Sequence, residues 1–299
     1  MMGTDALRNE RAASEHVRRA RVRHLRGLGW LLPLWALACG VLASNRFDLQ
    51  ERTEWLRLAA LTLLVVGGWG RLWIAISRTD WATPLGAWRA WRAEHRLASL
   101  PYTRPGTASD RSTRWIGQLR AWWRATLWPC CGSALTSALA ALLSSAVLAL
   151  LIGPEIILLS IACLAVMQLA LAWERGRGQA GVGWQACVAV LLPWLAGHAA
   201  FGTLTVASGC AACGVALTIA GLGAFESGIG RAVAATAALL LAGLLTITHH
   251  PLAAAGVLAL HAILALLVPW RGEPVSPAWQ WEFGLPFAVA AGFVVAGAL

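Results

Sequence analysis

The polar stretch that decides the organisation of this chain runs from Arg71 to Arg124 and reads RLWIAISRTDWATPLGAWRAWRAEHRLASLPYTRPGTASDRSTRWIGQLRAWWR. It holds ten of the 24 basic residues, all of which are arginine, and it interrupts a chain that is otherwise mostly apolar. The chain has 299 residues, of which 58% are hydrophobic and 13% charged, and its mean hydropathy is +0.63. Because this composition is typical of membrane proteins, the sequence predicts an all-α integral membrane protein with this stretch as its main polar loop.

Nine apolar segments are candidates for membrane-spanning helices, two before the polar loop and seven after it. They are 28–44, 57–76, 127–152, 155–173, 184–206, 209–224, 231–248, 252–269 and 283–299. A helix needs about 20 residues to cross the hydrocarbon core. The sixth segment has only 16 residues and could merge with the fifth into one hairpin. Nine transmembrane helices is the best count, and a count between seven and nine stays open.

The distribution of arginine predicts the orientation of the chain. With a cytoplasmic N-terminus, the inner segments hold 21 of the 24 arginines. The outer segments hold only Arg46, Arg52 and Arg57. Cytoplasmic loops of membrane proteins carry such an excess of arginine. We therefore expect a multi-pass protein of the cell membrane, most simply a prokaryotic inner membrane.

The same pattern divides the chain into two parts. Residues 1–26 form a basic cytoplasmic segment, and residues 27–299 form a membrane domain with a large cytoplasmic loop at about 77–126. The net charge of +10 is explained by this topology and by contact with anionic lipid. The sequence therefore predicts membrane lipid as a partner and no nucleic acid.

Two segments of the polar loop have the spacing of amphipathic helices. Trp88, Trp91 and His95 recur at helical spacing among arginines, and the pattern returns between Arg111 and Arg124. Tryptophan is typical of the membrane interface, and arginine extends towards lipid phosphates. We predict two helices in the headgroup region, joined by a turn-rich connector at 100–110.

Polar groups within the spans are few. His198 lies in the fifth span and His261 in the eighth, and for both we expect a neutral imidazole bonded to a neighbouring carbonyl group. Cys210 and Cys213 form a CxxC pair without the context of a redox motif, and we expect small buried residues at a helix interface. No phosphate-binding loop, zinc motif or proton relay is present in the sequence, which disfavours a pump or channel.

Charged residues on the predicted cytoplasmic face form the candidate site. Asp80 follows the second span and Glu226 follows the sixth. Near them in this topology stand Arg71, Arg78, Tyr102, Arg104 and Arg111. Arginine clusters suit a diphosphate or a lipid phosphate, although topology and headgroup contact explain any one of these arginines better. Asp110 opens the second amphipathic segment, where capping of the helix N-terminus explains it.

The layout resembles the UbiA-type intramembrane prenyltransferases. That family shares nine spans, a cytoplasmic N-terminus and cytoplasmic loops after the second and sixth spans. Arg104-Pro-Gly-Thr-Ala108 is similar to the family's segment before the third span, and Leu192-Pro-Trp-Leu-Ala-Gly-His-Ala-Ala-Phe-Gly202 to its glycine-containing fifth span. The order of spans and loops resembles the family over most of the chain. The amino-acid sequence itself is similar only in these two short segments. It implies a UbiA-like bundle and transfer or binding of a prenyl group from an isoprenoid diphosphate.

The family holds Mg²⁺ and the diphosphate with two aspartate-rich motifs on these loops. The resemblance implies Asp80 and Glu226 as catalytic residues and Mg²⁺ ligands. It implies phosphate contacts from Arg71, Arg78, Arg104 and Arg111, and further site residues at Tyr102 and His198. One carboxylate per loop is a poor ligand set for Mg²⁺. A catalytically inactive membrane subunit or scaffold with a membrane protein partner is therefore the alternative, and a transporter is the third.

Overall fold

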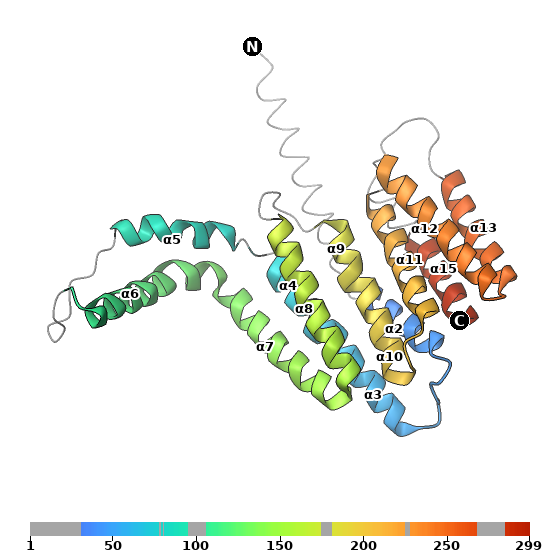
Figure 1. Ribbon diagram of the computed structural model, residues 1–299, viewed down its shortest axis with the longest axis horizontal. Coiled ribbons are helices and arrows are strands. Elements are labelled where there is room, and N and C mark those ends of the chain that lie inside the picture. Colours follow the sequence, from blue (N-terminus) through green and yellow to red (C-terminus); the bar gives the residue numbers. More distant parts are fainter. Residues whose placement is uncertain are drawn as a thin grey trace, which may run out of the picture.

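The computed structural model describes residues 31–77, 79, 81–94, 106–174, 181–224, 228–267 and 285–299. Every regular element in these residues is a helix, as the composition predicts (Figure 1). Six helical stretches are long and apolar enough to cross a membrane, which indicates a membrane-embedded protein. Three shorter helices, α2 (Leu31–Ala43), α13 (Pro251–Leu267) and α15 (Leu285–Ala298), are also strongly apolar.

Three of the six long stretches contain a π-helical segment. The first consists of α3 (Arg52–Thr62), η1 (Leu63–Gly70) and α4 (Arg71–Ser77). The next consists of α6 (Ala108–Trp122), η2 (Trp123–Leu127) and α7 (Trp128–Ile152). The last consists of α9 (Val182–Ala186), η3 (Cys187–Leu191) and α10 (Leu192–Phe201). The other long helices are α8 (Pro154–Glu174), α11 (Val206–Gly223) and α12 (Gly228–Ile247).

The predicted sixth span is a separate helix and does not merge with the fifth. Helix α10 ends at Phe201, five residues before the predicted end of the fifth span, because the chain becomes extended at Gly202. Thr205 then caps α11, since its side chain accepts a hydrogen bond from the backbone N–H of Ser208. This early start gives α11 18 residues, so it is long enough to cross a bilayer.

The predicted hairpin between the third and fourth spans is present at Gly153. The backbone φ angle there is +151°, a conformation that residues with a side chain rarely adopt. Pro154 begins α8 directly afterwards, where its missing N–H needs no partner. The sequence Gly153-Pro154 therefore ends α7 and reverses the chain within a single residue.

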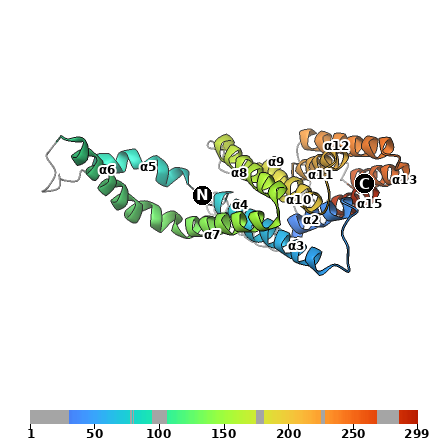
Figure 2. The same ribbon diagram turned by 60° about the horizontal axis from the view of Figure 1, so that its bottom comes forward.

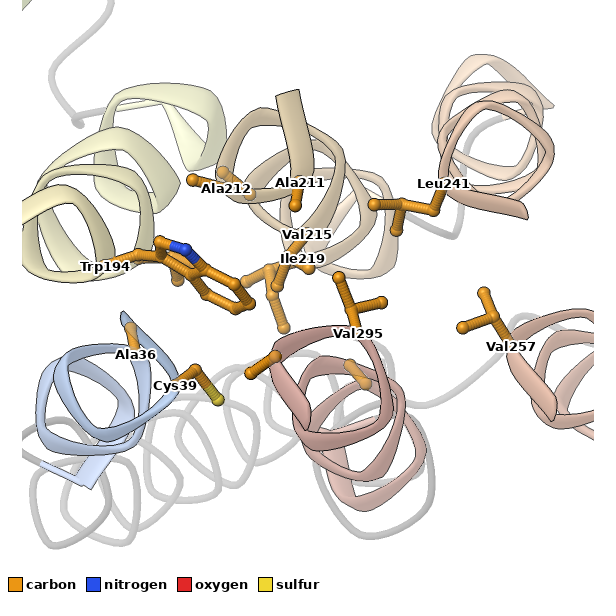
Figure 3. Packing of buried hydrophobic residues seen from close by; sticks show 14 of the residues in the cluster. Ala36, Cys39, Trp194, Ala211, Ala212, Val215, Ile219, Leu241, Val257 and Val295 are labelled. Carbon is orange, nitrogen blue, oxygen red and sulfur yellow. The ribbon is translucent and has the colours of Figure 1, made fainter. Parts of the chain in front are cut away.

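The centre of the bundle is a direct contact between α2 and α10. A Cβ atom placed on Gly40 would lie 2.0 Å from the carbonyl oxygen of Trp194, and one on Gly197 would lie 2.4 Å from that of Leu37. The two helices approach this closely only because both positions are glycine. Figure 3 shows Trp194 reaching from α10 towards the core between α2 and α11, with Val295 of α15 nearby.

The helices leave the bundle at two opposite ends. At one of these ends α4, α8 and α11 end and α9 and α12 begin (Figure 1). We call it the arginine-rich end, because the sequence places the inner, arginine-rich segments there. Helix α5 (Ala82–Glu94) and α6 form a hairpin that extends sideways from the bundle near this end, as both views show (Figure 2). The two predicted amphipathic helices are thus confirmed as helices. The longer one runs through η2 into α7 without a break.

Candidate functional site

The residues proposed from the sequence are only partly within the described structure. Outside the described residues lie Arg78, Asp80, Tyr102, Arg104 and Glu226. Arg71 is exposed at the first position of α4, within the bundle. Arg111 lies near the free end of the hairpin, where its Nη2 donates to the carbonyl oxygen of Gly106 at 3.3 Å. Arg71 and Arg111 therefore belong to separate parts of the molecule (Figure 1).

Asp110 stabilises the N-terminus of α6 as the sequence predicts, but from the first turn of the helix and not as the N-cap residue itself. Its carboxylate accepts a hydrogen bond from the backbone N–H of Gly106 at 3.1 Å and pairs with Arg114, one turn further along the helix. Thr107 is the capping residue, and its hydroxyl accepts from the backbone N–H of Asp110 at 3.3 Å. The side chain of each residue thus accepts a hydrogen bond from a backbone N–H at or next to the other residue. This arrangement is close to a capping box, and it fixes where α6 begins.

His198 is buried near the end of α10 and is fully engaged by its own chain. Its Nε2 lies 3.0 Å from the carbonyl oxygen of Thr203, which can only accept, so this nitrogen carries the hydrogen. In the neutral imidazole Nδ1 then accepts from the hydroxyl of Ser208 at 3.1 Å. The expected bond between His198 and a carbonyl group is confirmed. The Nδ1 of His261 lies 2.9 Å from the carbonyl oxygen of Val257 on its own helix, whereas its Nε2 is buried without a hydrogen-bond partner in the described structure.

Ser208 and His198 have the pairing of a nucleophile and a base, but they have no access to a substrate. The hydroxyl of Ser208 also accepts a hydrogen bond from Nε1 of Trp194 at 3.2 Å. Ser208 is completely buried, and His198 is 4% exposed. We name this set of Trp194, His198 and Ser208 the α10–α11 clasp. Its geometry joins two helices through satisfied polar groups, which is a structural role.

An apolar groove lies between α8, α9, η3 and α11, with a cavity of about 550 Å³. Its wall includes Trp173, Trp184, Cys187, Cys213, Leu217 and Ala220. A second cavity of about 420 Å³ shares Trp173 and Trp184 and continues along α8. The groove thus lies beside the arginine-rich end, at the last turn of α8 and the first turn of α9.

Small residues create this groove. Gly181 and Gly183 stand at the start of α9, and Ala216 and Ala220 lie one turn apart on α11. None of these positions carries a side chain large enough to fill the space between the helices. The spacing of Ala216 and Ala220 is visible in the sequence, but the pattern alone does not say whether a neighbouring helix or a groove covers it.

The prediction that Cys210 and Cys213 are buried is wrong. Both are exposed, and Cys213 lines the groove together with Cys187. Among the described residues, no three His, Cys, Asp or Glu side chains gather in a way that could hold a metal ion. The described lining of the groove is mainly apolar, with the thiols of Cys187 and Cys213.

Comparison of the chain with protein-family models, with curated proteins and with solved structures found no match.

Proposed function

We propose that this chain is a multi-spanning protein of the cell membrane that binds the hydrocarbon chain of an isoprenoid or a similar lipid. The observation that carries the proposal is the groove between α8, α9 and α11, whose volume of about 550 Å³ is that of a small-molecule site. The side chains of its wall are mainly aliphatic and aromatic, with two thiols. A hydrocarbon chain fills such a groove without leaving a strongly polar group unpaired.

The arginine-rich end faces the cytoplasm in this proposal. The excess of arginine in the segments that follow α4 and precede α2 supports this orientation. Trp173 and Trp184 lie at this end of the groove, and tryptophan is enriched where the hydrocarbon core meets the headgroups. A lipid in the groove would therefore present its headgroup to the cytoplasmic surface.

Prenyl transfer, which the resemblance to UbiA-type enzymes implies, would require Mg²⁺ held by Asp80 and Glu226. These residues follow α4 and α11 in the sequence, and α11 forms one wall of the groove. A single carboxylate on each loop gives Mg²⁺ few protein oxygen ligands. We therefore propose lipid binding as the primary function. If Asp80→Ala and Glu226→Ala both left prenyl transfer unchanged, these two residues would have no catalytic role.

Photo-crosslinking of the protein in lipid nanodiscs tests the groove directly. A polyprenyl phosphate with a diazirine on its chain should label peptides of α8, α9 and α11. Replacing the half-buried Ala220 by Trp should fill the groove and lower this labelling by about tenfold or more. The matched control is Ala235→Trp, at an exposed position of α12. Equal labelling of both variants, or even labelling of every apolar helix, would contradict the proposal.

A membrane subunit without catalytic activity is the second candidate. It is favoured by the α10–α11 clasp, in which the buried polar groups bond to one another and none is directed at a ligand. Binding of a prenyl diphosphate with and without Mg²⁺ separates the two candidates. Tight binding that requires Mg²⁺ supports an enzyme. Absence of binding, together with a stable co-purified membrane protein, supports the subunit.

A further inference from the structure

The α5–α6 hairpin is held together by tryptophan. The rings of Trp88 on α5 and Trp122 on α6 meet edge to face, with centroids 5.1 Å apart, and Trp91 stacks on Trp88 at 6.0 Å. Trp122 is only 4% exposed. Because α6 also continues through η2 into α7, the hairpin has a fixed attachment to a membrane-spanning helix.

The exposed surface of α6 and of the first residues of η2 combines large apolar side chains with arginine. Trp115, Ile116 and Trp123 are 47%, 58% and 38% exposed. At 3.6 residues per turn, these three side chains share an arc of about 100°. Arg111 flanks this arc on one side, and Arg120 and Arg124 flank it on the other; all three are exposed. Side chains of this kind, with an apolar centre and basic edges, are typical of helices that lie in a membrane surface.

Charge and position both identify the surface that this helix meets. Residues 81–124 contain eight arginines and two acidic residues, Glu94 and Asp110, and Asp110 is already paired with Arg114. The excess positive charge matches anionic lipid. In Figure 1 the hairpin runs sideways at the level of the arginine-rich ends of the bundle helices, where the headgroups of a surrounding bilayer would lie.

We propose that the exposed face of α6 and of the start of η2 binds the anionic headgroups of the membrane leaflet at the arginine-rich end. Trp115, Ile116 and Trp123 enter the boundary between headgroups and hydrocarbon, and Arg111, Arg120 and Arg124 contact lipid phosphates. Because these arginines bind anionic lipid, the position of the α5–α6 hairpin depends on the charge of the membrane. This inference is independent of the lipid-chain groove, which lies between other helices.

Hydrogen exchange of the full-length protein in nanodiscs tests the proposal. We expect amides of residues 108–122 to exchange more slowly in membranes with 30% phosphatidylglycerol than in pure phosphatidylcholine, a composition chosen to give a surface potential of about the size found in cells. The double variant Arg120→Gln/Arg124→Gln should reduce this difference by about fivefold or more. Sodium chloride at about 0.5 M should reduce it similarly in the native protein, because salt screens exposed charges.

The matched control is Arg46→Gln/Arg52→Gln, which removes two exposed arginines at the opposite end of the bundle and should leave the exchange of α6 unchanged. Equal exchange of α6 in the two membranes would overturn the proposal. The proposal would also be overturned if the amides of α6 exchanged slowly only after a soluble protein was added, because the exposed face would then bind a protein and not lipid. No isoprenoid is present in these experiments, so their result does not depend on the groove.

Discussion

The centre of the bundle and the α5–α6 hairpin bring pairs of helices together by opposite means. Helices α2 and α10 meet through Gly40 and Gly197, with the backbone of one helix against the backbone of the other. Helices α5 and α6 meet through the rings of Trp88 and Trp122. Within a bilayer the lipid is as apolar as the side chains, so helices gain stability by close packing rather than by removing apolar area from water. At the membrane surface water is present, and large aromatic side chains gain by being covered.

The same difference explains two uses of tryptophan in this chain. Trp194 and Trp69 are 0% and 2% exposed in the bundle, where they fill volume between helices. Trp115 and Trp123 are exposed on the hairpin. An indole ring suits both places, because it has a large apolar surface and a single polar N–H group.

The largest effect is expected from Gly40→Leu. A side chain at this position would overlap the backbone of Trp194, which cannot move without displacing α10. We expect a loss of about 3 kcal/mol or more in the free energy of unfolding. Thermal unfolding in detergent, followed by size-exclusion chromatography, measures it. The control is Gly243→Leu on α12, where an added Cβ meets nothing within 4 Å. Equal stability of the two variants would show that the α2–α10 contact is not close.

Trp122→Ala should loosen the hairpin and leave the bundle intact. The substitution removes the buried ring that contacts Trp88, and a loss of about 3 kcal/mol in the hairpin's own stability follows. Limited trypsin digestion should then cut faster at Arg89, Arg92 and Arg120, whereas the melting temperature of the bundle should change little. Trp115→Ala is the control, because Trp115 is exposed. Global unfolding of Trp122→Ala would mean that the hairpin and the bundle fold as one unit.

The sequence predicts helices well where one periodic pattern covers a whole element. The apolar segments 127–152 and 155–173 agree with α7 and α8 to within about two residues, since Gly153 and Pro154 separate them unambiguously. The end of the fifth helix was predicted less well. The segment 202–205 reads Gly-Thr-Leu-Thr and carries no charge that would end a span, and its extended conformation depends on Gly202 and on the capping by Thr205.

The candidate site was harder to predict than the fold. Arginine positions indicate which end of the bundle is basic, but they do not show that Arg111 is at the free end of the hairpin and Arg71 in the bundle. The groove depends on which faces of α8, α9 and α11 remain uncovered, and that is a property of packing between distant segments. Small residues such as Ala216 and Ala220 are equally typical of tight helix contacts and of open grooves.

Ser208→Ala should have the smallest of these effects, and it addresses the polar part of the bundle. The hydroxyl of Ser208 bonds both His198 and Trp194, so its removal leaves two buried nitrogen atoms without a partner. A cost of about 2 kcal/mol is expected, less than that of a backbone overlap at Gly40. The melting temperature in detergent measures it.

Ser144→Ala on α7 is the matched control, because its hydroxyl bonds only a backbone carbonyl of its own helix at 3.0 Å. If Ser208→Ala were as stable as this control, the α10–α11 clasp would contribute nothing. The contact between α10 and α11 would then depend on apolar packing alone. If instead Ser208→Ala lost stability and a second substitution, Trp194→Phe, restored part of it, the unpaired indole N–H would be the cause of the loss. The centre of the bundle would then combine the close backbone packing of α2 and α10 with the α10–α11 clasp, in which each buried polar group needs its partner.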